Sequence, residues 1–180
     1  MLVTLFVILG VIGGIVAFFL ILAGFLKKDY TVQRKIMINR PRAVVFDYIR
    51  HLKNQPSYSK WDMMDPDCKR EYAGTDGTVG FVSRWESDNK KVGSGWQEIV
   101  SIAGNSRMDV NLHFIKPFEA NSKAYFIAAD AGNESTEVTW AFEGSMKYPM
   151  NIMLMFMNME GMLGKDLQTG LENMKKNLEK

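Results

Sequence analysis

Cysteine and histidine are scarce in this sequence, and their scarcity excludes several kinds of site. The one cysteine, Cys68, cannot form an internal disulfide bond, which fits a reducing compartment. The two histidines, His51 and His113, show no metal-ligand spacing. A Ser-His-Asp arrangement and a glycine-rich phosphate loop are missing as well. We therefore expect no metal, no cofactor and no catalytic residues, and the sequence does not favour an enzyme.

A strong charge of either sign is also missing. The chain has 22 Lys and Arg against 20 Asp and Glu, a net charge of +2. Nucleic-acid binding usually requires a clustered basic face, so this balance gives it no support. The charges are unevenly placed, because residues 2–26 contain none. The ~154 residues that follow are enough for one core that buries about 70% of the unfolded surface.

The uncharged run at residues 2–26 is a candidate membrane-spanning helix. At about 1.5 Å per residue it is long enough to cross a hydrocarbon layer about 30 Å thick. A cleaved signal peptide is the alternative, and it requires a basic start, a shorter apolar run and a small-residue cleavage site. No Lys or Arg precedes the run, and Ala23-Gly24 makes only a weak cleavage site. We expect a retained anchor at residues 1–27 and one folded domain at residues 28–180.

Basic residues follow the apolar run. Lys27, Lys28, Arg34 and Lys35 lie on its C-terminal side. Under the positive-inside rule this predicts a single-pass membrane protein whose folded domain is cytoplasmic.

Alternating apolar residues predict a set of strands after the anchor. Val32, Ile36 and Ile38 alternate within a strand at Tyr30–Asn39, and Pro41 opens a helix with Asn39 as its cap. Turn residues then separate six further segments: Lys69–Ala73, Val79–Glu86, Val92–Ile102, Met108–Phe114, Ser122–Ala128 and Glu137–Glu143. Short connections of this kind predict an antiparallel meander.

The apolar period changes at the end of the chain. From Met150 to Lys180, a spacing of three and four residues relates Met153, Met157, Glu160, Gly164, Leu167, Leu171, Met174 and Leu178. This pattern predicts one long amphipathic helix, which must bury its apolar stripe against the sheet. The fold class is α+β.

This order resembles the START-like superfamily, also called SRPBCC or polyketide cyclase-dehydrase-like proteins. The resemblance covers residues 30–180 and rests on Ile36-Met37-Ile38-Asn39-Arg40-Pro41 with the helix after it, Tyr58-Ser59-Lys60-Trp61, Gly93-Ser94-Gly95-Trp96, Leu112-His113-Phe114 and Glu137-Val138-Thr139-Trp140. It implies a helix-grip fold, in which a curved antiparallel sheet wraps round the C-terminal helix with an apolar tunnel between them. Members bind lipids, sterols, polyketides or other hydrophobic molecules; a minority are cyclases, and others bind proteins.

Bulky side chains on the predicted inner faces are the candidate ligand-binding residues. Aromatic rings suit the wall of an apolar pocket, although each of them also suits a filled core. The set is Trp61, Phe81, Trp85, Trp96, Leu112, Phe114, Phe126, Trp140, Met153, Met157 and Glu160.

Two members of this set belong to a methionine-rich segment. Seven methionines lie between Met146 and Met162, and their flexible side chains suit a pliable gate or cavity wall. Glu160 follows on the same predicted helix face. Its carboxylate either projects into the cavity as an acid or polar anchor, or pairs with a Lys or Arg at the edge of the stripe.

These observations favour membrane-tethered binding of a hydrophobic small molecule, such as a lipid, isoprenoid or polyketide-like compound. A cyclase or dehydratase that uses Glu160 is one alternative. A protein-interaction module, with an exposed apolar patch and a filled, closed cavity, is another. The ligand and the oligomeric state are left open.

Overall fold

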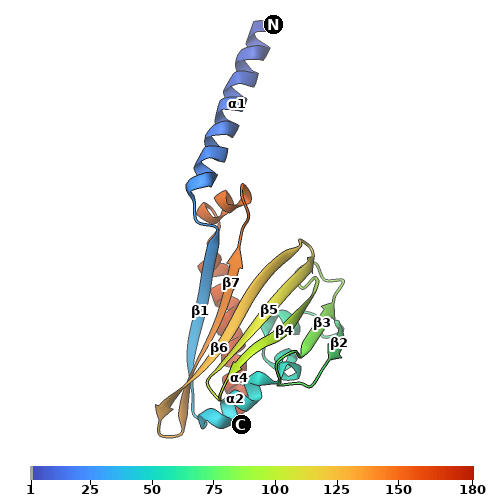
Figure 1. Cartoon of the computed structure of the whole chain (residues 1–180), viewed down its shortest axis with the longest axis vertical. Helices are drawn as coiled ribbons and strands as arrows, with labels where there is room; N and C mark the ends of the chain where they lie inside the picture. Colours follow the sequence, from blue (N-terminus) through green and yellow to red (C-terminus); the bar gives the residue numbers. More distant parts are fainter. Residues whose placement is uncertain (1) are drawn as a thin grey trace.

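The computed structural model describes residues 2–180 and confirms the α+β helix-grip fold (Figure 1). Its helical segments are α1 (Leu2–Phe25), α2 (Arg42–Arg50), η1 (Leu52–Ser57), α3 (Lys60–Met63), η2 (Met150–Met155) and α4 (Met159–Leu178). Its strands are β1 (Asp29–Ile38), β2 (Lys69–Ala73), β3 (Val82–Glu86), β4 (Ser94–Ala103), β5 (Arg107–Lys116), β6 (Ala120–Gly132) and β7 (Ser135–Ser145).

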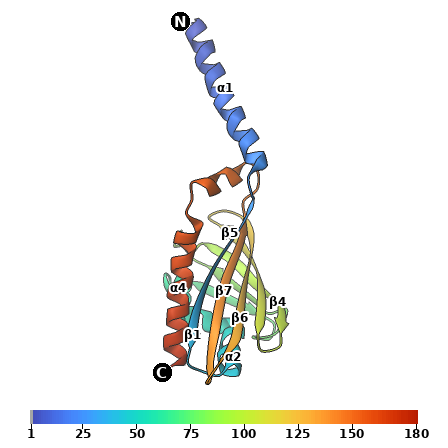
Figure 2. The ribbon, with the colours of Figure 1, turned by 90° about the vertical axis from the view of Figure 1, so that its left-hand side faces the viewer.

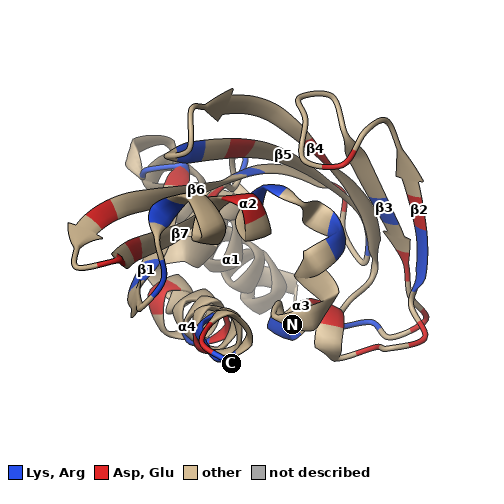
Figure 3. Cartoon of the chain, turned by 90° about the horizontal axis from the view of Figure 1, so that it is seen from below, with Lys and Arg blue, Asp and Glu red and all other residues tan. Residues whose placement is uncertain are grey.

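The seven strands form one antiparallel sheet in the order β1-β7-β6-β5-β4-β3-β2. Strands β2 to β7 follow one another as a meander, and β1 closes the edge beside β7. Seen from the end opposite α1, the sheet arches over α2, α3 and α4 (Figure 3). This curvature produces the concave face on which α4 lies.

The α1 helix extends away from the sheet and is almost fully exposed along its length (Figures 1 and 2). Its apolar window has a mean hydropathy of 3.0, and by length and composition it is able to cross a membrane. A signal sequence satisfies the same test, so the helix by itself is weak support for an anchor.

The α4 helix is shorter than the sequence pattern predicts, and the single helix from Met150 is wrong. Residues Met150–Met155 form the 3₁₀-helix η2, and α4 begins only at Met159. Asn158 has a non-helical backbone and its side chain accepts a hydrogen bond from the Gly161 N–H at 2.8 Å. The spacing of apolar residues continues across this cap, because spacing alone does not report where a capping side chain interrupts the backbone.

Two smaller predictions are also wrong. Asn39 does not cap α2; Pro41 holds the N-cap position, without a side-chain hydrogen bond, and the Asn39 N–H donates to Glu179 at the end of α4. Val79 lies before β3 and is exposed.

Candidate ligand cavity

A cavity of about 230 Å³ lies between the concave face of the sheet and α4. It occupies the half of the domain nearer α1, called here the α1 end. Phe114 near the end of β5, Phe142 near the end of β7 and Leu163 near the start of α4 all line it. The opposite half, called the far end, is solid, because Phe46, Ile49, Leu171 and Met174 are almost completely buried there.

Aromatic rings form one wall of this cavity. Phe126 and Trp140 stack with ring centroids 4.9 Å apart, and Trp61 meets Trp140 edge-on at 6.1 Å. Trp85 meets Phe114 edge-on at 5.8 Å. Six of the eleven candidate residues line the cavity: Trp61, Trp85, Leu112, Phe114, Phe126 and Trp140. Their contact with a ligand stays a prediction.

A glycine on β4 makes room for one of these rings. Gly95 is paired with Trp85 on β3 and with Phe114 on β5. A Cβ atom at Gly95 would lie 2.7 Å from the Trp85 ring and 2.4 Å from the His113 carbonyl oxygen. The absence of a side chain therefore lets the indole of Trp85 lie across β4 and form part of the wall.

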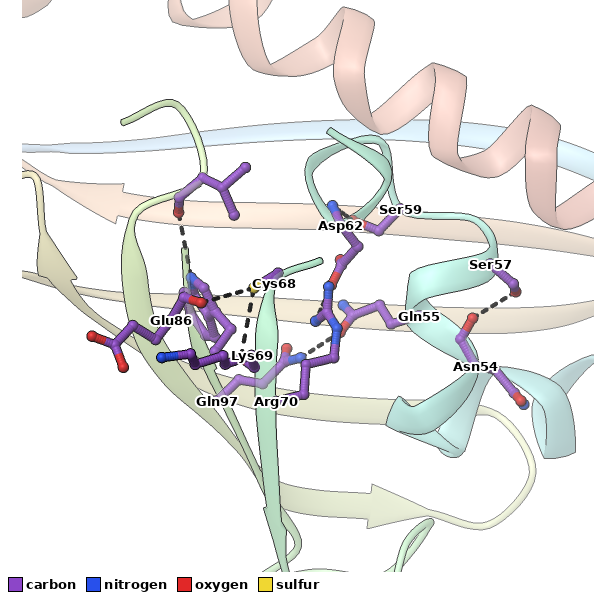
Figure 4. Close-up of polar contacts among 12 residues, drawn as sticks. Asn54, Gln55, Ser57, Ser59, Asp62, Cys68, Lys69, Arg70, Glu86 and Gln97 are labelled. Atoms are coloured by element: carbon purple, nitrogen blue, oxygen red, sulfur yellow. Dashed lines mark hydrogen bonds and ion pairs between the residues drawn. The ribbon is translucent and has the colours of Figure 1, made fainter. Parts of the chain in front are cut away.

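Polar side chains line the cavity as well, and we call them the polar wall: Gln55, Ser59, Asp62, Arg70 and Gln97 (Figure 4). Arg70 donates to Asp62 over 2.6 Å, and both side chains are more than 80% buried. Gln97 donates to the Gln55 side-chain oxygen, and both residues are buried. The cavity thus pairs an apolar surface with a small group of hydrogen-bonding side chains, an arrangement typical of ligand sites.

The sequence contained a signal for only part of this wall. Gln97 lies two residues before the buried Ile99 on β4, so strand alternation places both on the inner face. Gln55, Ser59 and Asp62 come from η1 and α3, whose irregular backbone has no alternation to follow.

Trp96 faces the outside of the sheet, which contradicts its predicted inward position. It is paired with His113 on β5, and the two rings stack 5.4 Å apart on the outer face. We predicted that Trp96, the largest apolar side chain of β4, would face inward. In the structure Gly95, Gln97 and Ile99 occupy the inner face instead. Phe81 is fully buried, but it stacks against Tyr72 and does not line the cavity.

Met153, Met157 and Glu160 also lie outside the cavity. Met153 and Met157 precede α4, so the predicted helix face does not exist at their positions. Glu160 forms an ion pair with Arg34 of β1, and its side chain is 62% exposed. The sequence left two environments open for the Glu160 carboxylate. In the structure it pairs with an arginine at the edge of α4 and does not project into the cavity.

Two buried groups near the cavity have raised pKa values. Burial raises the pKa of the Tyr58 hydroxyl well above its ordinary value, and the nearby Asp62 carboxylate adds to this shift. Burial also raises the pKa of the Cys68 thiol. Both groups therefore stay protonated near neutral pH. Among residues 2–180, no group of three or more His, Cys, Asp or Glu side chains is arranged to hold a metal ion.

Solved structures of several proteins share this fold. A Nitrosospira multiformis protein is 13% identical with a TM-score of 0.59, over 83% of this chain and 96% of that one. A Thermus thermophilus protein is 14% identical with a TM-score of 0.59, over 83% and 97%. Norcoclaurine synthase from Thalictrum flavum, in complex with dopamine and hydroxybenzaldehyde, is 10% identical with a TM-score of 0.60, over 87% and 90%. At these identities the likeness concerns the fold alone.

Sequence comparison identifies the family. No curated protein matches this sequence. Residues 29–179, which include every strand of the sheet and all of α4, match the family described as polyketide cyclase / dehydrase and lipid transport. Membership of this family supports a domain that binds hydrophobic ligands. The START-like resemblance is thereby confirmed, and the chain belongs to the polyketide cyclase / dehydrase and lipid transport family.

Proposed function

We propose that this chain binds a small amphipathic molecule in the cavity between sheet and α4, and that α1 holds the domain at a membrane. The observation that carries the proposal is the cavity itself, an apolar space with hydrogen-bonding groups confined to one wall. A well-packed core leaves no comparable space, so a cavity of this kind supports binding over a purely structural role.

The size of the cavity limits the ligand. Its volume of about 230 Å³ lies below the ~300–1,000 Å³ of pockets that enclose drug-sized molecules. A one-ring aromatic compound or a short chain fits this space, and so does one segment of a longer lipid. The norcoclaurine synthase structure holds dopamine and hydroxybenzaldehyde, two small aromatic molecules, on the same fold.

The polar wall defines the chemistry of the ligand. Asp62 and Arg70 compensate each other's charge, so the wall as a whole is neutral. Such a wall suits a hydroxyl, carbonyl or amide group better than a free charge, because an unpaired charge in a half-buried site is costly. We therefore expect an apolar ligand that carries one or two uncharged polar groups.

An anchor would help such a site to function. A ligand that partitions into the bilayer is concentrated near a domain tethered there, and weak affinity then suffices. The apolar length of α1 and the lysines directly after it, Lys27 and Lys28, support this arrangement with the folded domain on the cytoplasmic side.

The two alternatives have less support. The cyclase or dehydratase hypothesis relied on Glu160, whose carboxylate pairs with Arg34 outside the cavity. The interaction-module hypothesis expects an exposed apolar patch together with a filled cavity. Met150 and Phe156 are exposed, but this domain has open space beside Leu163 and Phe142.

Native mass spectrometry of the full chain in detergent, followed by solvent extraction, tests the proposal. Ala124 is 8% exposed and lines the cavity, so Ala124→Phe fills it from β6. Lys123→Phe is the matched control. Lys123 directly precedes Ala124 on β6 and is exposed on the outer face of the sheet, so a phenylalanine there does not enter the cavity. Lipids that merely coat α1 will be present in all three proteins.

The cavity ligand is the species retained by the parent chain and by Lys123→Phe but depleted in Ala124→Phe. Identical extracts from all three proteins would contradict the proposal. The two variants are compared only after circular dichroism has shown that both are folded.

A further inference from the structure

The methionine-rich segment carries the densest group of exposed apolar side chains in the folded domain. Met150, Met155 and Phe156 are 61%, 57% and 71% exposed. Together with Tyr148 and Met153 they form what we call the methionine patch. Single exposed apolar residues are normal on a protein surface, but five of them within residues 148–156 are a candidate contact for a partner.

The patch is fixed beside the end of α1. The buried side chain of Asn151 donates to the carbonyl oxygens of Ala23 at 2.7 Å and Leu26 at 3.2 Å. Ala23 lies in the last turn of α1 and Leu26 directly follows the helix. Carbonyl oxygens at a helix end lack the partner four residues on that the helix interior provides, and the Ala23 oxygen otherwise accepts only a long 3.4 Å hydrogen bond from the Leu26 N–H. Ala23 is consequently the one buried residue of α1.

A second attachment holds the other side of the segment. The Met146 N–H donates to the Lys28 carbonyl oxygen at 2.8 Å. The segment is therefore joined to the chain just before β1 as well as to the last turn of α1. Both views of the ribbon place η2 directly beside the lower end of α1 (Figures 1 and 2).

This position sets the level of the patch relative to a bilayer. When α1 crosses the hydrocarbon layer, its last turn and the following Lys27 and Lys28 lie at the headgroup boundary. Because Asn151 ties η2 to that turn, the patch lies at the same level. Residues 146–158 contain one lysine and no Asp or Glu, so the segment has no carboxylate for anionic headgroups to repel.

We propose that the methionine patch inserts shallowly into the lipid bilayer and is the domain's second membrane contact beside α1. The occupant is the boundary between headgroups and acyl chains, which accepts apolar side chains at a depth of about 5–10 Å. Flexible methionines suit this role, because they adapt to a fluid and irregular partner. The inference rests on the membrane tether of the proposed function.

The patch also gives the domain a fixed orientation. A single helix with a flexible connection would leave the cavity free to face any direction. Two contacts on one side of the domain keep the α1 end, and the cavity residues Phe114, Phe142 and Leu163, turned toward the bilayer.

Depth-dependent fluorescence quenching tests this inference on the full chain in vesicles of phosphatidylcholine and phosphatidylserine. Single cysteines are introduced in a Cys68→Ala background at Met155 in the patch, at Val44 on α2 and at Val16 in α1, and each is labelled with an environment-sensitive dye. All three positions are exposed, so the labels do not disturb a core. Phosphatidylcholine carrying a nitroxide near the headgroup or deep in the acyl chain serves as quencher.

We expect the shallow quencher to act at least about twofold more strongly at Met155 than at Val44, and the deep quencher to act most strongly at Val16. No quenching at Met155 with strong quenching at Val16 overturns the patch but leaves the tether intact. No quenching at any position overturns both, and the cavity is then judged by its own extraction experiment. Self-quenching at Met155 that grows with the protein-to-lipid ratio assigns the patch to a second copy and also overturns the proposal.

Discussion

The two ends of the folded domain use the same kind of residues with opposite results. At the far end, Phe46, Leu171 and Met174 fill the space under the sheet and are almost completely buried. At the α1 end, Phe114, Phe142 and Leu163 are also apolar and also face inward, yet they border a cavity. The far end therefore supplies most of the packing that stabilises the fold, and the α1 end is free to bind.

The arrangement of helices explains this difference. At the far end α2 enters the arch of the sheet and packs against β6 and β7. At the α1 end the single-turn helix α3 and the start of α4 border the cavity, and η2 packs on α1. The four residues of α3 occupy less space than the nine of α2, so the α1 end of the arch is less completely filled.

Truncation of one leucine at each end of α4 tests this comparison with the largest expected effect. Leu171 is fully buried, so Leu171→Ala should lower the free energy of unfolding by about 2–5 kcal/mol. Leu163 is half-buried beside an existing cavity, and Leu163→Ala should cost less than about 2 kcal/mol, because little new void is created. Urea unfolding of the full chain in mild detergent measures both values. Equal losses would contradict the division of the domain into a packed end and an open end.

Enlargement of two alanines on β6 tests the same division from the opposite direction. Ala128 is fully buried in the packed region, and Ala128→Leu should cost about 1–3 kcal/mol through overpacking. Ala124 lies four residues earlier on the same face of β6 and lines the cavity. Ala124→Leu should therefore leave the free energy of unfolding nearly unchanged. Thermal unfolding followed by circular dichroism compares the two. A large loss in Ala124→Leu would mean that the cavity is smaller in solution than its lining indicates.

The sequence predicted the fold well because the fold depends on periodic patterns. Strict alternation in β5 placed Met108 and Val110 inside, and both are buried there. The regular order of turns predicted the antiparallel meander, and the spacing within α4 placed Leu167 and Leu171 on its buried face.

The candidate site was harder to predict because its residues depend on exceptions to those patterns. Trp96 faces outward although it is the largest apolar residue of β4, and Gly95 beside it admits the Trp85 ring. The Asn158 cap and the Asn151 bonds to α1 separate η2 from α4, although apolar spacing runs through both. The Asn151 bonds join residues far apart in the chain, whereas the Asn158 cap is a local interruption of the backbone, and the spacing of apolar residues reports neither.

The smallest expected effect concerns the two attachments of α4 to β1, one at each end of the domain. At the α1 end the Arg34–Glu160 pair is exposed, and Glu160→Gln should change the free energy of unfolding by only about 0–1 kcal/mol. At the far end Glu179 accepts from the Asn39 N–H at 2.6 Å and from Lys175 at 2.9 Å. The hydrogen bond from Asn39, followed by that from Lys175, lowers the pKa of Glu179.

A lowered pKa in the folded state makes the contribution of Glu179 depend on pH in one direction. The carboxylate stabilises the fold at any pH above its unfolded pKa of about 4.3, and this contribution is lost as the pH falls through the lower folded value. The parent chain should therefore be more stable than Glu179→Gln at neutral pH, and the difference should shrink in acid. Urea unfolding at a series of pH values between neutral and strongly acidic measures this difference. A gap that stays constant with pH would mean that Glu179 holds the far end of α4 by packing and not by its charge.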